Sequence, residues 1–376
     1  MDDTHFDSRH HHHHEDFHHH EDFDSTFTQT NLVSDGSVTA MHTDPNLINP
    51  WGVSLPPGGP FWVSDNNAGV TTVYDGAGNQ VTVAGHTAIN IAPPLGQTGS
   101  GTPTGQVFNS FGTGFDISQG HKTASSVFLF ATEDGTISGW NPGVNSGSSV
   151  IAVDKSKGGE GAVYKGLAIA QTDDGPRLYA ANFRDGTVDV FNSRFKQVDS
   201  FTDPNLPKGY APFNVQVLDG HLFVTFALQD TAKHDDVAGA GNGFVDEFDL
   251  EGHHLQRVAS GGPLNSPWGL AIAPKGFGDA SGDLLVGNFG DGTINAFNLK
   301  NDQFQGKLDG ADGKPIVIGD LWALTTGSGA SSDNPNAIYF TAGVQNEMHG
   351  LFGSLTANPE MQHTAMAPHG MHSMHG

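Results

Sequence analysis

The sequence predicts an all-β fold, a six-bladed β-propeller, from three observations. Glycine accounts for 51 of the 376 residues and only 36% of the residues are apolar, which is typical of a β protein with many tight turns. A short strand-like segment that ends in an aromatic residue recurs six times along the chain. Three further strand-like runs accompany most copies, so that four short strands repeat about every 50 residues, as the blades of a propeller do.

The recurring segment opens with glycine in five of its six copies and carries its aromatic residue one position before the end. The aromatic residues are spaced 66, 51, 57, 49 and 55 positions apart. The copies are Gly69–Asp75, Gly135–Asn141, Gly186–Asn192, Gly243–Asp249, Gly292–Asn298 and Glu347–Gly353, with the aromatic residues Tyr74, Trp140, Phe191, Phe248, Phe297 and Phe352.

The other strands of each blade are predicted from the same alignment. The innermost strands are expected at 51–55, 115–119, 165–170, 213–217, 268–273 and 322–326. A second strand is expected directly before each recurring segment, and outer strands are expected at 80–85, 149–153, 196–201 and 254–259.

The sixth blade lacks an outer strand of its own after Leu355. Thr26–Val33 shows strand alternation before the first blade, and we expect this segment to complete the sixth blade and close the ring, which removes an exposed sheet edge. The chain is therefore divided into a His- and acid-rich tail at 1–24, a propeller at 25–356 and a Met/His-rich tail at 357–376, and both tails are expected to be disordered.

Composition excludes several classes of function. Lys and Arg number 16 against 41 Asp and Glu, so 16 − 41 gives a formal charge of −25, which disfavours nucleic acid and anionic membranes. The absence of cysteine excludes disulfides, thiol catalysis and thiolate metal sites. No apolar run approaches the ~20 residues of a membrane span.

The two tails predict transition-metal binding. Imidazole binds Cu²⁺, Ni²⁺ and Zn²⁺, and thioether sulfur selects Cu(I), so copper is the expected metal, with nickel or zinc as alternatives. The N-terminal run also allows the interpretation of a purification tag, although the near-repeat HHHEDF favours a native segment. The expected ligands are His10, His11, His12, His13, His14, His18, His19 and His20 in the first tail, and His363, Met366, His369, Met371, His372, Met374 and His375 in the second.

Three stretches of the body resemble a family of secreted bacterial six-bladed propeller proteins that occur with exosortase surface sorting. They are TDPNLINPWG at Thr43–Gly52, KHDDVAGAGNGFVDEFD at Lys233–Asp249 and the run Ser266–Asn298. The Pro-Trp-Gly strand openings are also similar to NHL-type repeats. The resemblance implies export to the periplasm, the cell surface or the medium, with a signal peptide removed before residue 1, and it implies no established chemistry.

One face of the predicted propeller collects the candidate site residues. In an up-and-down blade, the start of the first strand and the end of the second lie on the same face, where long loops usually carry function. The candidate channel-mouth residues are Asp65, Asn182, Asn288, His234, Asp235 and Asp236. The side-chain oxygens of Asp65, Asn182 and Asn288 suit calcium, whereas Asp and Asn before a turn also act as turn caps. The candidate ligand rim, which equally suits packing between blades, is Trp51, Phe115, Lys165, Phe213, Trp268 and Trp322.

Three functions follow as alternatives. The first is a secreted propeller that binds copper through its tails and contacts a partner, such as another copy of itself or a matrix polysaccharide, through its face. The second is a metal-dependent, calcium-type hydrolase or lyase with its site at the channel mouth. The third is a structural surface or matrix protein, so the sequence leaves open whether the protein is an enzyme.

Overall fold

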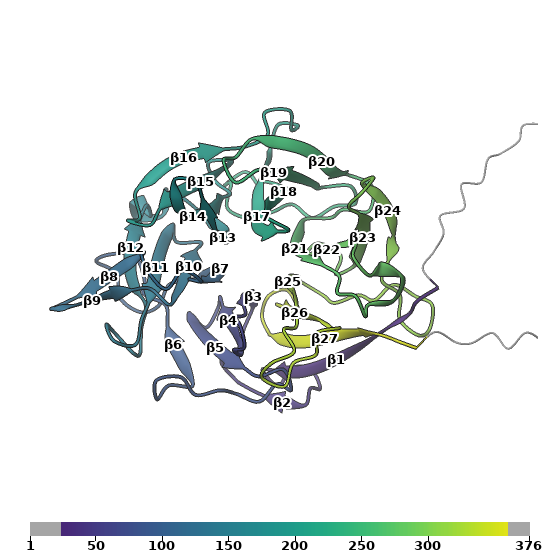
Figure 1. Cartoon of the computed structure of the whole chain (residues 1–376), viewed down its shortest axis with the longest axis horizontal. Coiled ribbons are helices and arrows are strands. Elements are labelled where there is room, and N and C mark those ends of the chain that lie inside the picture. The colour runs from purple at the N-terminus through teal and green to yellow at the C-terminus, as the bar shows by residue number, and fades with distance from the viewer. Residues whose placement is uncertain (1–23, 360–376) are drawn as a thin grey trace, which may run out of the picture.

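The computed structural model, which describes residues 24–359, is an all-β ring of six antiparallel sheets around a central axis (Figure 1). Apart from the strands, these residues contain only two 3-10 turns, Lys157–Gly159 and Gly278–Ala280. Within 24–359, no helix is long and apolar enough to span a membrane. The predicted six-bladed propeller is confirmed.

In each of five blades, four strands follow one another from the axis outward in the order of the sequence. In blade two, a separate hairpin is inserted between the first and the second strand. Blade one contains β3 (Pro50–Ser54), β4 (Phe61–Asp65), β5 (Val70–Tyr74) and β6 (Ala88–Asn90). Blade two contains β7 (Pro103–Phe108), β10 (Phe128–Thr132), β11 (Thr136–Trp140) and β12 (Val150–Asp154). Blade three contains β13 (Tyr164–Thr172), β14 (Gly175–Asn182), β15 (Thr187–Asn192) and β16 (Gln197–Phe201). Blade four contains β17 (Tyr210–Leu218), β18 (His221–Leu228), β19 (Phe244–Phe248) and β20 (His254–Ser260). Blade five contains β21 (Pro267–Ile272), β22 (Leu284–Asn288), β23 (Ile294–Asn298) and β24 (Gln303–Lys307).

Blade six joins the two ends of the described chain. Its inner strands are β25 (Leu321–Thr326), β26 (Ile338–Ala342) and β27 (Leu351–Ala357), and its outer strand is β1 (Phe27–Ser34), which carries the short parallel β2 (His42–Thr43). The antiparallel pairing of β1 with β27 runs from Phe27 opposite Ala357 to Ser34 opposite Leu351. The expected closure of the ring by the N-terminal strand is therefore present.

Two strand predictions are wrong. The inner strand of blade two is β7 and not 115–119, because the latter segment forms β8 (Asp116–Gln119) in a separate hairpin with β9 (Lys122–Ser125). In blade one the outer strand is β6 and not 80–85, whose residues make only isolated bridges. Alternation of apolar and polar residues marks both segments as strands, but it does not say which neighbour a strand pairs with.

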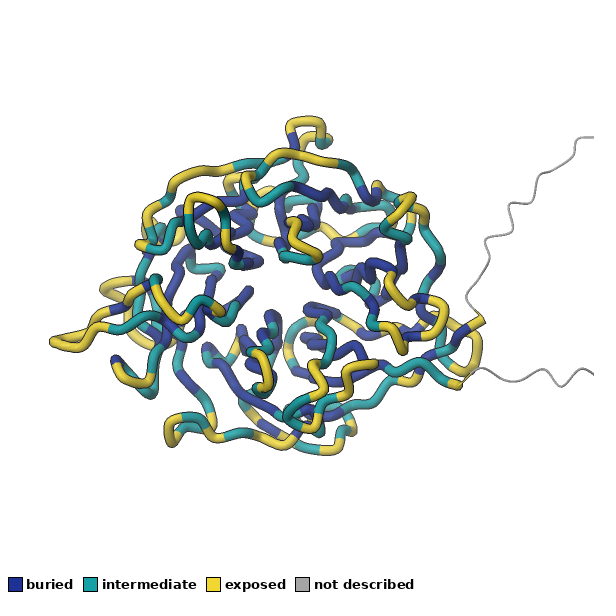
Figure 2. The backbone as a smooth tube through the Cα atoms, viewed as in Figure 1, coloured by how far each residue is buried: buried dark blue, intermediate teal, exposed yellow. Residues whose placement is uncertain are grey.

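The recurring aromatic column supplies the core between blades. All six aromatic residues are buried, and the buried backbone lies toward the inside of the ring (Figure 2). Between blades one and two, Trp62 stacks on Phe128 with ring centroids 3.8 Å apart and Trp140 packs beside them. Aromatic burial of this kind stabilises the contact of neighbouring blades, which explains why the aromatic position recurs in every blade.

Glycine in the inner strands allows adjacent blades to approach closely. A Cβ on Gly52 would lie 2.5 Å from the carbonyl oxygen of Thr104, and one on Gly105 would lie 2.4 Å from the amide nitrogen of Leu167. Gly269 meets the carbonyl oxygen of Trp322 in the same way, at 2.6 Å. At these three junctions the inner strands of adjacent blades are packed backbone to backbone, and the glycine positions have no room for a Cβ.

Candidate functional site

Aromatic side chains close the central channel near one face of the ring. Trp51 stacks on Trp322 with centroids 3.5 Å apart, and Trp268 lies edge-on to both. Phe213 and Phe289 pack against Trp322 from blades four and five. All of these except Phe289 are buried, so they form an aromatic plug across the axis and not an exposed ligand rim.

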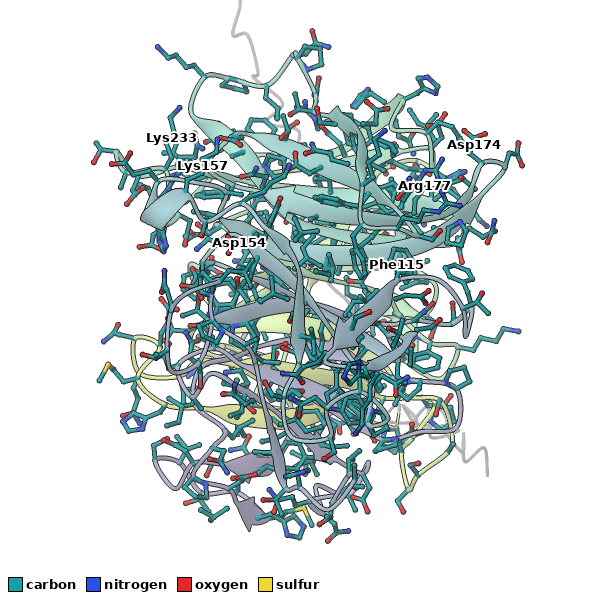
Figure 3. The ribbon with its side chains drawn as sticks, turned by 90° about the vertical axis from the view of Figure 1, so that its left-hand side faces the viewer. Phe115, Asp154, Lys157, Asp174, Arg177 and Lys233 are labelled. Carbon is teal, nitrogen blue, oxygen red and sulfur yellow. The ribbon has the colours of Figure 1, made fainter. Side chains whose placement is uncertain are left out.

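Phe115 was also expected in this rim, and that expectation is wrong. Phe115 is buried, and it packs against Phe195 in the core between blades two and three. In the edge-on view it lies toward the side of the ring that carries Asp174, whereas Lys233 of the long loop in blade four lies on the opposite side (Figure 3). The cause is the wrong inner strand assigned to blade two.

Lys165 anchors a charged cluster beside the plug. Its ammonium group bonds the carboxylate of Glu133 and lies 3.4 Å from Oδ1 of Asp235, while its side chain is only 2% exposed. The same nitrogen lies 5.0 Å from the ring centroid of Trp51 and 5.8 Å from that of Phe183. Burial alone would lower the pKa of Lys165, but the charges of Glu133 and Asp235 outweigh it and raise that pKa, so the lysine stays charged.

His234 and Asp235 form a hydrogen-bonded pair above this lysine, on the loop between β18 and β19. Nδ1 of His234 lies 2.8 Å from Oδ1 of Asp235, and the backbone amide of His234 donates to Asp230. The bond to Asp235 raises the pKa of His234, and the same bond lowers the pKa of Asp235 to about 2. The His234 side chain is 38% exposed, so this imidazole is in contact with solvent.

Glu347 brings a second carboxyl group of different character to the mouth. Gln345, Asn346 and Glu347 all have left-handed backbone conformations, with φ of 61°, 59° and 61°, which is strained for residues with a Cβ. The turn is held by Asn49, whose Nδ2 donates to the Glu347 carboxylate at 2.8 Å, and by Asn67, whose Nδ2 donates to the Glu347 carbonyl oxygen at 2.7 Å. Burial raises the pKa of Glu347 to about 7, and the nearby charges of Glu133 and Asp235 add to that rise.

Asp65, Asn182 and Asn288, which occupy the same position in three blades, are not brought together with this cluster. Each is buried at the end of its second strand and is used within its own part of the ring. Asn182 donates to Asp185 at 2.9 Å and Asn288 donates to Asp291 at 3.2 Å, so both cap the turn that follows, as the structural interpretation expects. Asp65 accepts a hydrogen bond from Thr72, and burial raises its pKa well above the usual range.

Of the candidate mouth residues, the structure places His234, Asp235 and Asp236 on the loop at the cluster and adds four residues that the sequence did not single out. Burial raises the pKa of Asp236, whose Oδ2 has no hydrogen-bond partner among the described residues. Glu133 lies just after the second strand of blade two, and its partners, such as Asn66 of blade one, come from other blades. The added residues are Asn49, Asn67, Glu133 and Glu347.

A cavity of about 570 Å³ occupies the opposite end of the channel, beyond the aromatic plug. Trp268 contributes to its wall, together with inner-strand residues such as Ser54, Gln106, Asn214 and Thr325. Its lining, drawn from the described residues, contains no Asp, Glu, Lys, Arg or His. Ser54 and Thr325 lie at the far ends of their inner strands, whereas Trp51 and Lys165 lie near the strand starts, so the cavity and the charged cluster are on different sides of the plug.

The predicted ligands of the two tails lie outside the described residues, but the points where the tails begin are adjacent. The amide nitrogen of Asn358 donates to the carbonyl oxygen of Thr26 at 2.8 Å, and Thr28 Oγ1 donates to Asn358 Oδ1 at 2.6 Å. The His-rich and the Met/His-rich segments therefore start from neighbouring strands of one blade.

Comparison with known proteins identifies relatives of the whole body of the chain. No model of a known protein family matches it. The chain is 35% identical to the uncharacterized protein R648 of Acanthamoeba polyphaga mimivirus, over 88% of this chain and 80% of that protein. It is 34% identical to the uncharacterized protein L690 of the same virus, over 88% of this chain and 86% of that protein. These relatives are viral, and the comparisons give no support to the bacterial exosortase-associated family.

Solved structures with similar folds share little sequence with the chain. A Bacteroides thetaiotaomicron protein of unknown function has a TM-score of 0.51 at 9% identity, covering 89% of this chain and 76% of that one. A streptogramin B lyase has a TM-score of 0.49 at 12% identity, covering 89% of this chain and 98% of that one. At such identities the likeness concerns the fold and not the chemistry. By its sequence, the chain belongs to the same family as the mimivirus proteins R648 and L690, a family of six-bladed β-propellers.

Proposed function

We propose that the channel mouth is the acid–base site of a hydrolase or lyase, with His234 as the general base. The single observation that carries this proposal is the His234–Asp235 pair at 2.8 Å, anchored by the buried ammonium group of Lys165. A carboxylate bonded to Nδ1 fixes the tautomer and orientation of an imidazole and leaves Nε2 free to accept a proton.

Glu347 suits the complementary role of proton donor. A carboxyl group with a pKa of about 7 is partly protonated at neutral pH, whereas Asp235, with a pKa of about 2, is fully ionised. Neighbouring groups whose pKa values are driven apart in this way are typical of acid–base pairs. In hydrolysis, Nε2 of His234 takes a proton from water as the water oxygen attacks the carbonyl carbon, the bond from that carbon to the leaving oxygen breaks, and Glu347 protonates the leaving oxygen. In a lyase reaction, His234 takes a proton from the carbon next to the carbon–oxygen bond, a carbon–carbon double bond forms as that bond breaks, and Glu347 protonates the leaving oxygen.

Calcium at Asp65, Asn182 and Asn288 does not fit this structure, because the three residues are buried in different blades. The side-chain oxygens of Asn182 and Asn288 also accept hydrogen bonds from the backbone amides of Val163 and Asn265. The ligand atoms of Glu133, His234 and Asp235 do lie within 4.8 Å of one another. However, the ammonium group of Lys165 bonds the same two carboxylates, and a divalent cation would have to compete with it. We therefore place no metal in the proposed step.

The proposal is tested by assaying p-nitrophenyl acetate and a set of simple lactones with the full chain and with His234→Ala. His121→Ala is the matched control, because His121 is an exposed histidine on the β8–β9 hairpin. We expect His234→Ala to lower the rate at least 100-fold, in the usual range for loss of a general base, and His121→Ala to leave it unchanged. Equal rates for the wild type and both variants would overturn the role of His234.

A second candidate function, the capture of copper by the two tails, is favoured by their adjacent origins. Because β1 and β27 pair at their ends, imidazole and thioether donors from both tails are tethered at one point, which raises their effective concentration for a shared ion. Titration with Cu²⁺ and Cu(I) is expected to show weaker binding when either 1–23 or 360–376 is deleted. Unchanged affinity in both deletions would contradict the joint site.

A further inference from the structure

A second cluster of potential ligands lies at the junction of blades three and four, away from the channel. Asp246 belongs to β19, His254 belongs to the adjacent β20, and Asp203 follows the end of β16 in blade three. One ligand atom from each of these three residues lies within 4.8 Å of the others. Two blades therefore contribute to one set of two carboxylates and one imidazole.

One carboxylate oxygen of this cluster is buried and without a hydrogen bond. The Asp246 side chain is fully buried, and its Oδ2 has no hydrogen-bond partner among the described residues. Nε2 of His254 faces that oxygen at 3.6 Å and lies 3.9 Å from Oδ2 of Asp203. These separations are too long for hydrogen bonds. They are close to the separation of about 3.4 Å expected for two ligands that share one tetrahedral Zn²⁺ at 2.0–2.2 Å.

Arg257 links the two carboxylates of this junction. Arg257 bonds Asp246 through Nε and Asp203 through Nη2, and its guanidinium group lies 4.7 Å from the ring centroid of Phe244. Arg257 bonds Oδ1 of Asp246 and Oδ2 of Asp203, so a bound ion would take the unpaired Oδ2 of Asp246 and share Asp203 with Arg257. The set Glu133, His234 and Asp235 at the channel mouth has no such buried oxygen without a hydrogen bond.

We propose that Asp203, Asp246 and His254 bind a divalent transition-metal ion, with Zn²⁺ as the best match, and that this ion links blade three to blade four. A mixed imidazole and carboxylate set suits zinc, whereas calcium prefers oxygen ligands alone. The His254 side chain is 31% exposed, so the ion has a path from solvent and a position open to water. This site is independent of the tails and of the channel mouth.

The neighbouring histidine provides a matched control. His253 is paired with Asp249 at 2.8 Å and lies outside the cluster, with a side chain that is 77% exposed. Because the tails are unchanged in both variants, a difference between His254→Ala and His253→Ala isolates the proposed site. Asp203→Asn is a second variant, which removes a ligand charge and keeps the shape of the side chain.

The experiment is calorimetric titration of the full chain with Zn²⁺, together with thermal unfolding with and without the ion. We expect the wild type and His253→Ala to bind one more equivalent of zinc than His254→Ala and Asp203→Asn. We also expect zinc to raise the Tm of the first two proteins by several degrees more than that of the last two. Equal stoichiometry and equal Tm shifts in all four proteins would overturn the proposal and leave Arg257 as the only cation at this junction.

Discussion

The two ends of the central channel are built from the same inner strands, yet they have opposite chemical character. At the mouth, Lys165 bonds Glu133 and Asp235 from two other blades, and Glu347 accepts a hydrogen bond from Asn49. At the other end, a cavity of about 570 Å³ is lined by uncharged residues. The plug of Trp51, Trp268 and Trp322 separates the two.

The difference arises from the side chains of the inner strands and from the loops at each end of the channel. Along an inner strand the backbone is paired on one side only, by the second strand of its own blade, so its side chains decide the character of the channel. The mouth also receives the long β18–β19 loop and the left-handed turn at Gln345–Glu347, which bring ionisable groups to the axis. Reactive groups thus come from loops that a rigid ring positions.

The largest expected loss of unfolding free energy comes from removing a ring of the aromatic plug that separates the two ends of the channel. Trp322→Ala would delete a buried ring that stacks on Trp51 and Phe289, and loss of such a residue costs about 3–5 kcal/mol of unfolding free energy. Urea unfolding checks this value, with Leu95→Ala, an exposed apolar residue, as the control. A loss below about 1 kcal/mol would mean that the plug is not part of the continuous core.

A smaller loss of unfolding free energy is expected from a substitution that forces two inner strands apart. Gly105→Ala would place a Cβ 2.4 Å from the Leu167 amide nitrogen, and such overpacking costs about 1–3 kcal/mol. Gly319→Ala is the matched control, because a Cβ there would meet nothing within 4 Å. If both variants unfold at the same urea concentration, the glycine contacts between inner strands do not limit the approach of the blades.

The smallest effect concerns the mouth alone and depends on pH. The pKa of Glu347 is about 7 when folded and 4.5 is its ordinary value, so the folded state binds more protons between those values. Stability from this group is therefore present below about pH 4.5 and is lost as the pH rises through 7. Because Glu347 is partly exposed, we expect its contribution to this loss of unfolding free energy with rising pH to be about 1–2 kcal/mol, and Glu347→Gln should abolish it.

Unfolding at pH 5 and pH 8 measures this difference for the wild type and Glu347→Gln. Asp283→Asn is the control. Burial raises the pKa of Asp283 to about 6, which is lower than that of Glu347, so this variant should change the difference in stability between pH 5 and pH 8 by less. An identical pH dependence for the wild type and Glu347→Gln would show that the Glu347 carboxyl is ionised normally in the folded protein.

The sequence predicted the six blades correctly but assigned the wrong segment as the inner strand of blade two. The aromatic column predicted six blades, because burial between blades imposes the same requirement at the same place in each repeat. Blade two has an extra hairpin, and its segment 115–119 alternates as well as the true inner strand Pro103–Phe108 does. The inner strand of blade two has Gly105 at its close contact with blade three, but it lacks the tryptophan that opens the inner strands of blades one, five and six.

The site was predicted only in part. The loop with His234 and Asp235 was visible as a long insertion between two strands, which is a local feature. The partners of that loop were not visible, since Lys165 lies 70 positions from Asp235 and Asn49 lies 298 positions from Glu347. Asp65, Asn182 and Asn288 stood out in the sequence because they occupy the same position in three blades, and in two of those blades the Asn side chain caps the turn that follows.

By itself, the sequence determined the number of blades, the closure of the ring by Thr26–Val33 and the composition of the tails. Those properties follow from the period and the residue types of contiguous segments. Only the tertiary structure decided which ionisable groups meet at the mouth and at the junction of Asp203, Asp246 and His254. Contacts of that kind cross from blade to blade, and the register between blades is set by packing at the axis and not by any local pattern.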